Sequence, residues 1–231
     1  MKNASILKRA MLAGATCVAL SATPLVHAGV LVINSISGQA VTFNYNNANF
    51  GTTAGAFTGT FDGSPLTWWC VDLAKHVTVP GGPYNDYTAA PFQSPPLGFG
   101  AARLADLQRL FTNDFGLALT SAQNSAAFQI AIWDILFDND ANLSTYGGAG
   151  QFGLSAGNAT TIAIAQGWVN ALGSDSSQYP LFQLTSPSHQ DFITPTAPGL
   201  VPEPSALSLL GAGLVALMLA LRRRETRGHT V

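Results

Sequence analysis

Short apolar runs, many of them alternating with polar residues, dominate the chain between residues 30 and 79. These runs are rich in β-branched and aromatic side chains, and clusters of Gly and Asn separate them, as is usual between antiparallel strands. The pattern predicts strands at residues 30–36, 40–45, 56–61, 66–71 and 76–79. The following segment, residues 80–98, is rich in Pro and Gly and is expected to form a loop.

Apolar positions then recur at helical spacing. One stripe, made by Leu104, Leu107, Leu110 and Phe111, predicts a helix over residues 101–115. A second helix is expected to start at a cap provided by Thr120 or Ser121 and to end near Phe137. Its apolar residues fall on nearly every side, which predicts a buried helix.

The last part of the central region predicts a loop at residues 139–157, a third helix at 158–172, and short strands at 181–185 and 190–194. Strands followed by helices favour an α+β fold rather than an alternating α/β one. We therefore expect a β-rich, sandwich-like or barrel-like part that carries a helical insert of about three helices.

The N-terminus has the layout of a secretory signal peptide. Basic residues at positions 2, 8 and 9 precede an apolar or small run at 10–22, and Pro24 breaks that run. Val26 and Ala28 are small residues at the −3 and −1 positions of a cleavage site, so residues 1–28 are expected to be removed after export. The alternative is an N-terminal membrane anchor, but the run is short for a membrane span.

The C-terminus contains a second apolar run, residues 205–221, which is long enough for a short transmembrane helix. It ends at Arg222, Arg223 and Arg224, which predicts that residues 225–231 stay in the cytoplasm. With a signal peptide upstream, residues 29–186 would then form an extracytoplasmic domain. Prolines in residues 187–200 predict a stiff tether between this domain and the membrane.

The order of parts within residues 201–224 is more specific than a plain anchor. Pro202, Glu203 and Pro204 directly precede the apolar run, and the three arginines directly follow it. This arrangement resembles the PEP-CTERM sorting signal of Gram-negative, exopolysaccharide-producing bacteria. The resemblance implies an exosortase-type membrane protease as a partner. It also implies a transient inner-membrane anchor, followed by delivery to the cell surface or the extracellular biofilm matrix.

Composition sharpens this division. The whole chain is 47% hydrophobic and 10% charged, with a net charge of −2. Hydrophobicity this high disfavours intrinsic disorder, and the lack of a basic excess disfavours nucleic-acid binding. Residues 29–200 hold three basic residues and ten aspartates, a net charge of −7, together with all the Trp, Tyr and Phe residues. The exported part is therefore acidic and aromatic-rich.

Cys70 is the single cysteine of the mature domain, because Cys17 would leave with the signal peptide. An unpaired extracellular cysteine is a buried inert thiol, one half of an intermolecular disulfide, or a reactive group. Gln129 is a polar residue in the nearly wholly apolar second helix. Its amide needs hydrogen-bond partners there, and a loop carbonyl in the core is the simplest one.

Two segments together suggest a chemistry for these residues. The first runs from Trp69 through Cys70 to Asp72, and the second reads Phe-Gln-Ile-Ala-Ile-Trp from Phe128 to Trp133. They resemble the thioester (TQXA) domain of bacterial surface adhesins, although Phe128 stands where that family usually has Thr.

The resemblance implies an internal thioester between the Cys70 sulfur and the Gln129 side-chain carbonyl, shielded from water by Trp69 and Trp133 with help from Trp68. Surface amines or hydroxyls would attack it once, giving a covalent attachment. This is nucleophilic acyl chemistry without turnover, so it implies no enzyme activity, no metal and no cofactor. The alternative function is a passive structural or glycan-binding protein of the exopolysaccharide matrix.

Two weaker patterns remain. Asp138, Asp140 and Asn142 alternate like the start of a calcium loop, but the pattern fails at Leu143 and Ala149, which favours a polar turn. A cysteine-hydrolase set would need Cys70, Asp191 and either His76 or His189. Nothing local in the sequence supports that set.

Overall fold

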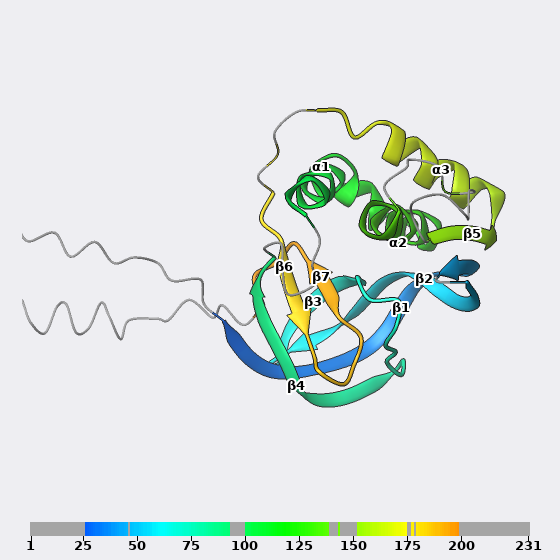
Figure 1. Ribbon diagram of the computed structural model, residues 1–231. Coiled ribbons are helices and arrows are strands. Elements are labelled where there is room, and N and C mark those ends of the chain that lie inside the picture. The colour runs from blue at the N-terminus through cyan, green and yellow to red at the C-terminus, as the bar shows by residue number, and fades with distance from the viewer. Residues whose placement is uncertain are drawn as a thin grey trace, which may run out of the picture.

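The structure of the protein is a computed structural model. It describes residues 26–45, 47–92, 100–138, 143, 152–174, 177 and 179–198. These residues contain a closed antiparallel barrel and three helices that cover one end of it (Figure 1).

Six strands form the barrel. They are β1 (His27–Tyr45), β2 (Ala48–Phe61), β3 (Ser64–Cys70), β4 (Gly81–Pro91), β6 (Phe182–Thr185) and β7 (Phe192–Thr194). The order β2-β3-β7-β6-β4-β1 closes on itself because β1 also pairs with β2. The short strand β5 (Phe152–Ala156) adds to the C-terminal part of β1, and every pairing is antiparallel.

Strand β1 is long enough to serve three neighbours. Its first residues pair with β4, its last residues pair with β5, and β2 runs along most of its length. A register irregularity between Ile33 and Ser35 bends the strand, as bulges do in barrels. The β2–β3 hairpin turns at Asp62 and Gly63, which both have positive φ angles, as the tightest hairpin turns require.

The helices are α1 (Ala101–Ala118), α2 (Ala122–Phe137) and α3 (Ala159–Asn170). Ser121 caps α2 by accepting a hydrogen bond from the Asn124 backbone N–H at 3.1 Å. Asn158 caps α3 in the same way. Helix α2 is buried along nearly all its length because it lies between the barrel and the other two helices.

Two apolar cores meet at β3 and α2. The barrel core includes Leu31, Phe57, Trp68, Cys70, Trp133 and Phe192. The helix core includes Trp69, Val71, Phe111, Phe128, Ile132 and Ile193. Successive residues of a strand point to opposite faces, so Trp68 and Cys70 face one core while Trp69 and Val71 face the other.

The predicted α+β class, barrel-like β part and three helices are confirmed. Residues 80–98 were expected to form a loop, and this was wrong for Gly81–Pro91, which form β4. Both long edges of β4 find partners, in β1 and β6, and this pairing outweighs the local Pro and Gly content. Strand β5 likewise lies inside the loop expected at residues 139–157.

Two further expectations need correction. Residues 76–79 form no strand; Val77 and Val79 alternate inward only because they pack as a loop against the barrel core. Residues 187–200 are not a tether throughout, because β7 lies within them and pairs with both β3 and β6. The folded domain therefore extends at least to residue 194.

Strand β1 begins at His27, two residues before the cleavage point expected after Ala28. Residues 1–25 of the expected signal peptide, the sorting segment at residues 201–224 and the cytoplasmic tail at 225–231 lie outside the described residues. Among the helices that the structure describes, none has the length and apolar character needed to cross a bilayer.

Candidate functional site

The Gln129 side chain forms a pair of hydrogen bonds with the main chain of Cys70. The Cys70 N–H donates to Gln129 Oε1, and Gln129 Nε2 donates to the Cys70 carbonyl, both at 2.8 Å. Cys70 is 1% exposed to solvent, and Gln129 is 0% exposed. The structure thus brings together the two residues that the sequence singled out from separate segments.

The Gln129 contact fills a gap in the hydrogen bonding along one edge of β3. Pairing between β2 and β3 ends at Phe57 and Trp68, two residues before Cys70. On the other side of β3, Val71 N–H donates to the Asp191 carbonyl beside β7. The Gln129 amide therefore takes the position that a further β2 residue would occupy, and it satisfies the Cys70 backbone groups that β2 leaves free.

The Cys70 sulfur points into the barrel core, where it has several polar neighbours. It donates to the Asp72 carbonyl at 2.9 Å, and it accepts from Gln190 Nε2 at 2.8 Å and from Asp72 N–H at 3.3 Å. Burial raises the pKa of the Cys70 thiol to about 12, although hydrogen bonding to Asp72, Trp133 and Gln190 opposes that shift. The free thiol is therefore protonated at neutral pH.

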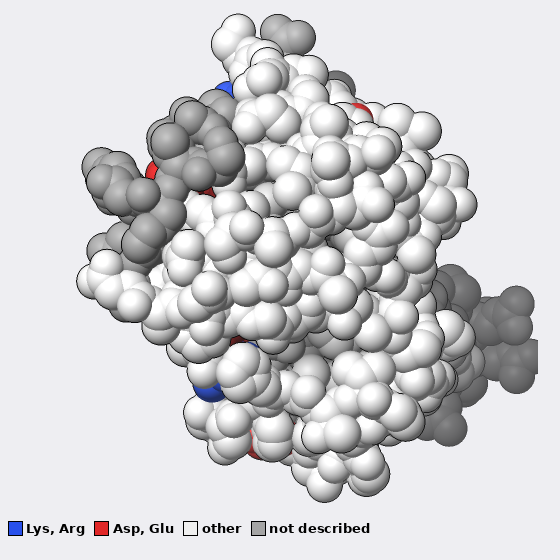
Figure 2. All heavy atoms as spheres, turned by 90° about the vertical axis from the view of Figure 1, so that its right-hand side faces the viewer, with Lys and Arg blue, Asp and Glu red and all other residues white. Residues whose placement is uncertain are grey.

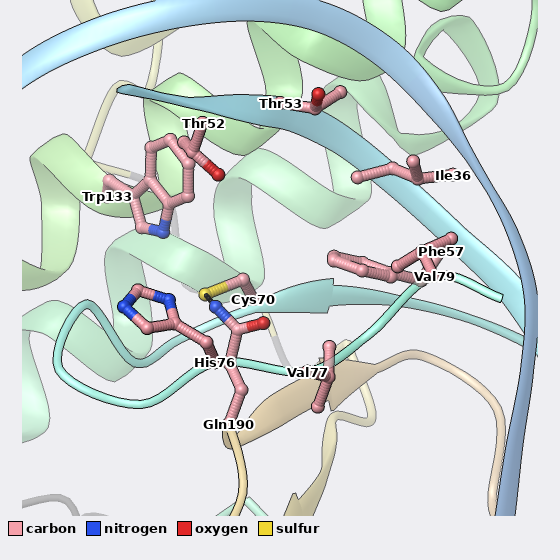
Figure 3. A pocket seen from close by; sticks show the side chains of 10 residues that line it. All are labelled: Ile36, Thr52, Thr53, Phe57, Cys70, His76, Val77, Val79, Trp133 and Gln190. Atoms are coloured by element: carbon pink, nitrogen blue, oxygen red, sulfur yellow. Dashed lines mark hydrogen bonds between the residues drawn. The ribbon is translucent and has the colours of Figure 1, made fainter. Parts of the chain in front are cut away.

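A pocket of about 320 Å³ opens beside this sulfur. Figure 3 shows Trp133 on one side of Cys70, with its indole nitrogen on the edge toward the sulfur, and His76 and Gln190 on the other. The Trp133 N–H meets no hydrogen-bond acceptor among the described residues that satisfies normal geometry. The sulfur is thus buried but borders a space that a small molecule can enter.

Gln190 is held in place by its neighbours along the chain. Its carbonyl accepts from the Tyr87 hydroxyl at 2.6 Å, and its side chain also donates to the Asp72 carbonyl at 3.1 Å. The next residue, Asp191, contacts Lys75 Nζ at 3.2 Å. These contacts tie the segment before β7 to the segment after β3, so Gln190 is positioned against the sulfur from both sides.

The ion pair between Lys75 and Asp191 stabilises the buried carboxylate of Asp191. Lys75 Nζ lies 3.4 Å from Asp72 Oδ2 and donates to the Ser186 carbonyl at 2.7 Å. Burial raises the pKa of Asp191, while hydrogen bonds from Ser186 and Lys75 oppose the rise. Lys75 is thus the cation that joins two acidic side chains, Asp72 and Asp191.

This arrangement supplies most groups that acyl chemistry requires. The Cys70 N–H already contacts the Gln129 carbonyl oxygen, where negative charge would develop if a nucleophile attacked the carbonyl carbon. Gln190 donates to the sulfur, which favours the sulfur as a leaving group when a thioester is opened. The nucleophile, the acyl group and two stabilising donors are therefore local to one site.

Trp69 does not lie where the thioester resemblance implied. It packs in the helix core against Phe111, Phe115 and Phe128, with its ring centroid 5.1 Å from that of Phe128. Because neighbouring strand residues face opposite sides, Trp69 faces away from the sulfur. Trp133 lines the pocket beside the sulfur, and Trp68 shares the same core.

The fold separates His76 from His189, the two histidines considered for a cysteine-hydrolase set. His76 lines the pocket with Cys70, whereas His189 Nδ1 lies 3.1 Å from Asp86 Oδ1 and its ring packs 4.4 Å from that of Tyr84. The sequence interpretation missed Gln190 altogether. Its place at the start of the strand expected at residues 190–194 predicts contact with the sheet, but nothing in the sequence pairs it with Cys70.

The calcium pattern is only partly covered. Asp138 is buried at the end of α2, while Asp140 and Asn142 lie outside the described residues. No group of three or more His, Cys, Asp or Glu side chains with metal-binding spacing occurs in the part of the chain that the structure describes.

Comparison with known proteins adds a fold likeness and a sorting motif. The N-terminal domain of the Streptococcus pyogenes pilus tip adhesin Cpa is similar in structure, at 12% identity and a TM-score of 0.40, over 60% of this chain and 81% of that one. No curated protein sequence matches the chain. Residues 200–224 match the PEP-CTERM protein-sorting motif, so the predicted motif is confirmed and the chain carries the signal of an exported protein that an exosortase processes.

Proposed function

We propose that this exported protein forms an internal thioester between Cys70 and Gln129 and uses it to attach covalently to a target at the cell surface or in the extracellular matrix. The sorting motif at residues 200–224 supports the surface location. The attachment chemistry rests on the buried contact between the Gln129 side chain and the Cys70 main chain.

The observation that carries the proposal is the paired hydrogen bond between the Gln129 amide and the Cys70 main chain. It holds the acyl group against the residue that carries the nucleophile, which is the proximity that intramolecular acyl transfer needs. It also places a backbone N–H on the carbonyl oxygen before any reaction.

The bond-forming step is balanced within the two side chains. The Cys70 sulfur attacks the Gln129 side-chain carbonyl carbon, the C–N bond breaks, and the thiol proton leaves with the amide nitrogen as ammonia. Because burial holds the Cys70 pKa at about 12, the sulfur must lose its proton as it attacks. Gln190 and Asp72, which donate to the sulfur, favour the partial thiolate that this step needs.

The second step uses the stored acyl group. A target amine or hydroxyl attacks the Gln129 carbonyl, the C–S bond breaks, and Cys70 recovers its proton as a thiol. Trp133 covers the sulfur's side of the bond and limits access by water. The attachment happens once for each protein molecule, so the protein is consumed rather than turned over.

One observation favours the alternative, a passive matrix protein. The same hydrogen-bond pair gives both polar atoms of the buried Gln129 amide, and the N–H and C=O of Cys70, a partner with no reaction at all. In that case Cys70 is a buried thiol that serves packing, as buried free cysteines usually do.

Intact-mass measurement of the chain isolated after export separates the two functions. A thioester makes the protein lighter than its calculated mass by one ammonia, and it joins the peptides that contain Cys70 and Gln129. Treatment with methylamine should then release a thiol at Cys70 and leave a methylamide on Gln129. A full calculated mass, together with no methylamine adduct, would reject the thioester.

Two variants provide the controls. Cys70→Ala removes the nucleophile, and Gln129→Glu replaces the leaving amide nitrogen with a carboxyl oxygen of nearly the same shape. Both should show the full calculated mass and no methylamine adduct. A mass deficit that persists in either variant would mean that ammonia is lost elsewhere in the chain.

A further inference from the structure

The pocket beside Cys70 has an uncharged lining. Its described walls combine aromatic rings, from Phe57 and Trp133, with the hydroxyl of Thr52 and the amide of Gln190. None of the described residues that line it is Asp, Glu, Lys or Arg. The nearby carboxylates Asp72 and Asp191 are already engaged by Lys75.

His76 adds a basic group at the rim of this pocket. It belongs to the irregular segment after β3, in which Val77 and Val79 pack against the barrel core while His76 remains exposed. Asp72 Oδ1 fixes the start of that segment by accepting from the backbone N–H groups of Ala74 and Lys75, at 2.7 and 3.2 Å. Figure 3 shows the imidazole on the same side of the pocket as the Cys70 sulfur.

We propose that the acceptor of the Gln129 acyl group is a hydroxyl of a carbohydrate, which enters this pocket and gives its proton to His76. This inference rests on the thioester proposed above and adds the substrate class and the base. His76 would be a catalytic residue, because it contacts the attacking hydroxyl.

The chemistry of the two acceptor types favours a hydroxyl. A lysine amine is protonated at neutral pH, with only about one molecule in a thousand neutral, and a pocket that selects it usually offers a carboxylate. A hydroxyl enters uncharged, but it is a weak nucleophile that needs a base in position, and imidazole is the side chain most often used. Among the described residues, the lining supplies an imidazole and no carboxylate.

The polar groups of the pocket also suit a sugar. Aromatic rings pack against the C–H faces of sugars, while hydroxyl and amide groups bind their oxygens. The buried Trp133 N–H interacts with the Cys70 sulfur but has no acceptor at normal hydrogen-bond geometry among the described residues, so it is available as a donor to an entering oxygen. A volume of about 320 Å³ is at the small end for ligand sites, so it suits one sugar unit of a longer chain.

The face of the molecule that carries the β1–β2 hairpin agrees with an uncharged partner. Figure 2 shows the face formed by α3, β5 and the β1–β2 hairpin, on which few charged side chains appear. Residues 28–61, which make up nearly all of β1 and β2, contain no Asp, Glu, Lys or Arg. A surface of Thr, Ser, Asn and Gly makes hydrogen bonds without long-range electrostatic steering, which matches a neutral polysaccharide better than a basic protein.

The transfer step balances without a further reactant. His76 takes the hydroxyl proton as the sugar oxygen attacks the Gln129 carbonyl carbon, and the C–S bond breaks as the C–O bond forms. The proton then passes to the Cys70 sulfur, leaving an ester on Gln129 and a free thiol on Cys70. Water could follow the same route, so His76 should also accelerate the slow hydrolysis of the thioester.

The test compares two nucleophiles on the thioester form of the exported chain. Methyl glucopyranoside supplies a neutral sugar hydroxyl, and methylamine supplies an amine that attacks without a base. In the unaltered chain both should give mass adducts on the peptide containing Gln129. His76→Gln should slow formation of the sugar ester by about a hundredfold, the lower end of the range for general-base catalysis, and change the methylamine rate less than about threefold. It should also lengthen the lifetime of the thioester in buffer.

Thr78→Ala is the matched control, because Thr78 is an exposed neighbour in the same segment and does not line the pocket. It should leave both rates unchanged. No sugar ester in the unaltered chain despite a methylamine adduct, or equal effects of His76→Gln on both nucleophiles, would overturn the inference while leaving the thioester intact. A chain that never shows the loss of ammonia would instead overturn the proposed function, and the inference with it.

Discussion

The barrel core and the helix core pack against opposite faces of β3, yet they differ in what lies at their boundary. In the helix core, Trp69 is enclosed by Phe111, Phe115 and Phe128, with edge-on ring contacts typical of a close-packed interior. In the barrel core, the Cys70 sulfur meets donors from Gln190 and Asp72 and borders a pocket. Side chains on the helix-core face of β3 are close-packed, whereas polar groups interrupt the packing on its barrel-core face.

This difference separates stability from chemistry across a single strand. Residues 68–70 read Trp-Trp-Cys, and their alternation sends one tryptophan to each core. Helix α2 repeats the division, since Phe128 faces the helix core, Trp133 faces the barrel core, and Gln129 lies at the edge of the strand between them. Substitutions on the two sides should therefore have different signatures.

The largest loss of stability is expected on the closed side. Trp69→Ala removes a fully buried ring from the helix core and should lower the free energy of unfolding by about 3–5 kcal/mol. Denaturant unfolding measures this loss, with Leu119→Ala as the exposed control that should change stability by less than about 0.5 kcal/mol. A loss below about 1 kcal/mol for Trp69→Ala would show that the helix core is not close-packed around Trp69.

A smaller loss is expected at the boundary between the cores. Gln129→Ala leaves the buried N–H and C=O of Cys70 without partners and should cost about 2–3 kcal/mol in unfolding free energy. Gln129→Glu can restore both hydrogen bonds when its carboxyl is protonated. It should therefore be close to the unaltered chain in stability at pH 5 and clearly less stable at pH 8, because burial disfavours the charged form. Equal losses at both pH values would contradict a buried amide site.

Local patterns accounted for the helices and most strands because their signals are local. The stripe of Leu107, Leu110 and Phe111 and the Ser121 cap both follow from neighbours within a few residues. Strand β4 was missed because its stability comes from pairing with β1 and with β6, which lies about a hundred residues later in the chain. Pro and Gly signals are weak evidence against a strand when partners exist on both sides.

The site was predictable in part for a similar reason. A lone cysteine and a polar residue in an apolar helix are visible in the sequence, and so Cys70 and Gln129 could be named. The face that Trp69 occupies depends on the register of β3 against both cores, and shielding was assigned to it wrongly. Gln190 contacts the sulfur and His76 lines the same pocket, and both lie in irregular segments that the sequence pattern assigns to strands, at residues 190–194 and 76–79.

The ion pairs of Lys75 with Asp72 and Asp191 give the next prediction. Lys75→Met removes the cation shared by Asp72 and Asp191 and should lower the free energy of unfolding by about 1–2 kcal/mol at pH 8. Burial already raises the pKa of Asp191, and removal of Lys75 should raise it further. The loss should therefore shrink as the pH falls toward 5 and Asp191 begins to take up a proton. A loss independent of pH would show that Lys75 contributes through its methylene chain alone.

The helix side offers a carboxyl of the opposite kind. Asp114 on α1 is buried, with 8% exposed, and the described residues provide it with no ion-pair partner. Burial raises its pKa from 3.8 to about 6. Its charged form is thus disfavoured by folding, so its contribution is most favourable below about pH 4 and is lost as the pH rises through about 6.

Asp114→Asn should consequently stabilise the protein at pH 8 by on the order of 1 kcal/mol, since one pKa unit is worth about 1.4 kcal/mol and part of the carboxyl remains hydrated. At pH 3.5, where both side chains are neutral, the variant and the unaltered chain should unfold at the same denaturant concentration. Lys75→Met and Asp114→Asn then move stability in opposite directions at pH 8, because one leaves a carboxylate without its cation and the other removes a carboxylate that never had one. If Asp114→Asn is neutral or destabilising at pH 8, the carboxyl is solvated after all, and the helix side is more open than its aromatic packing implies.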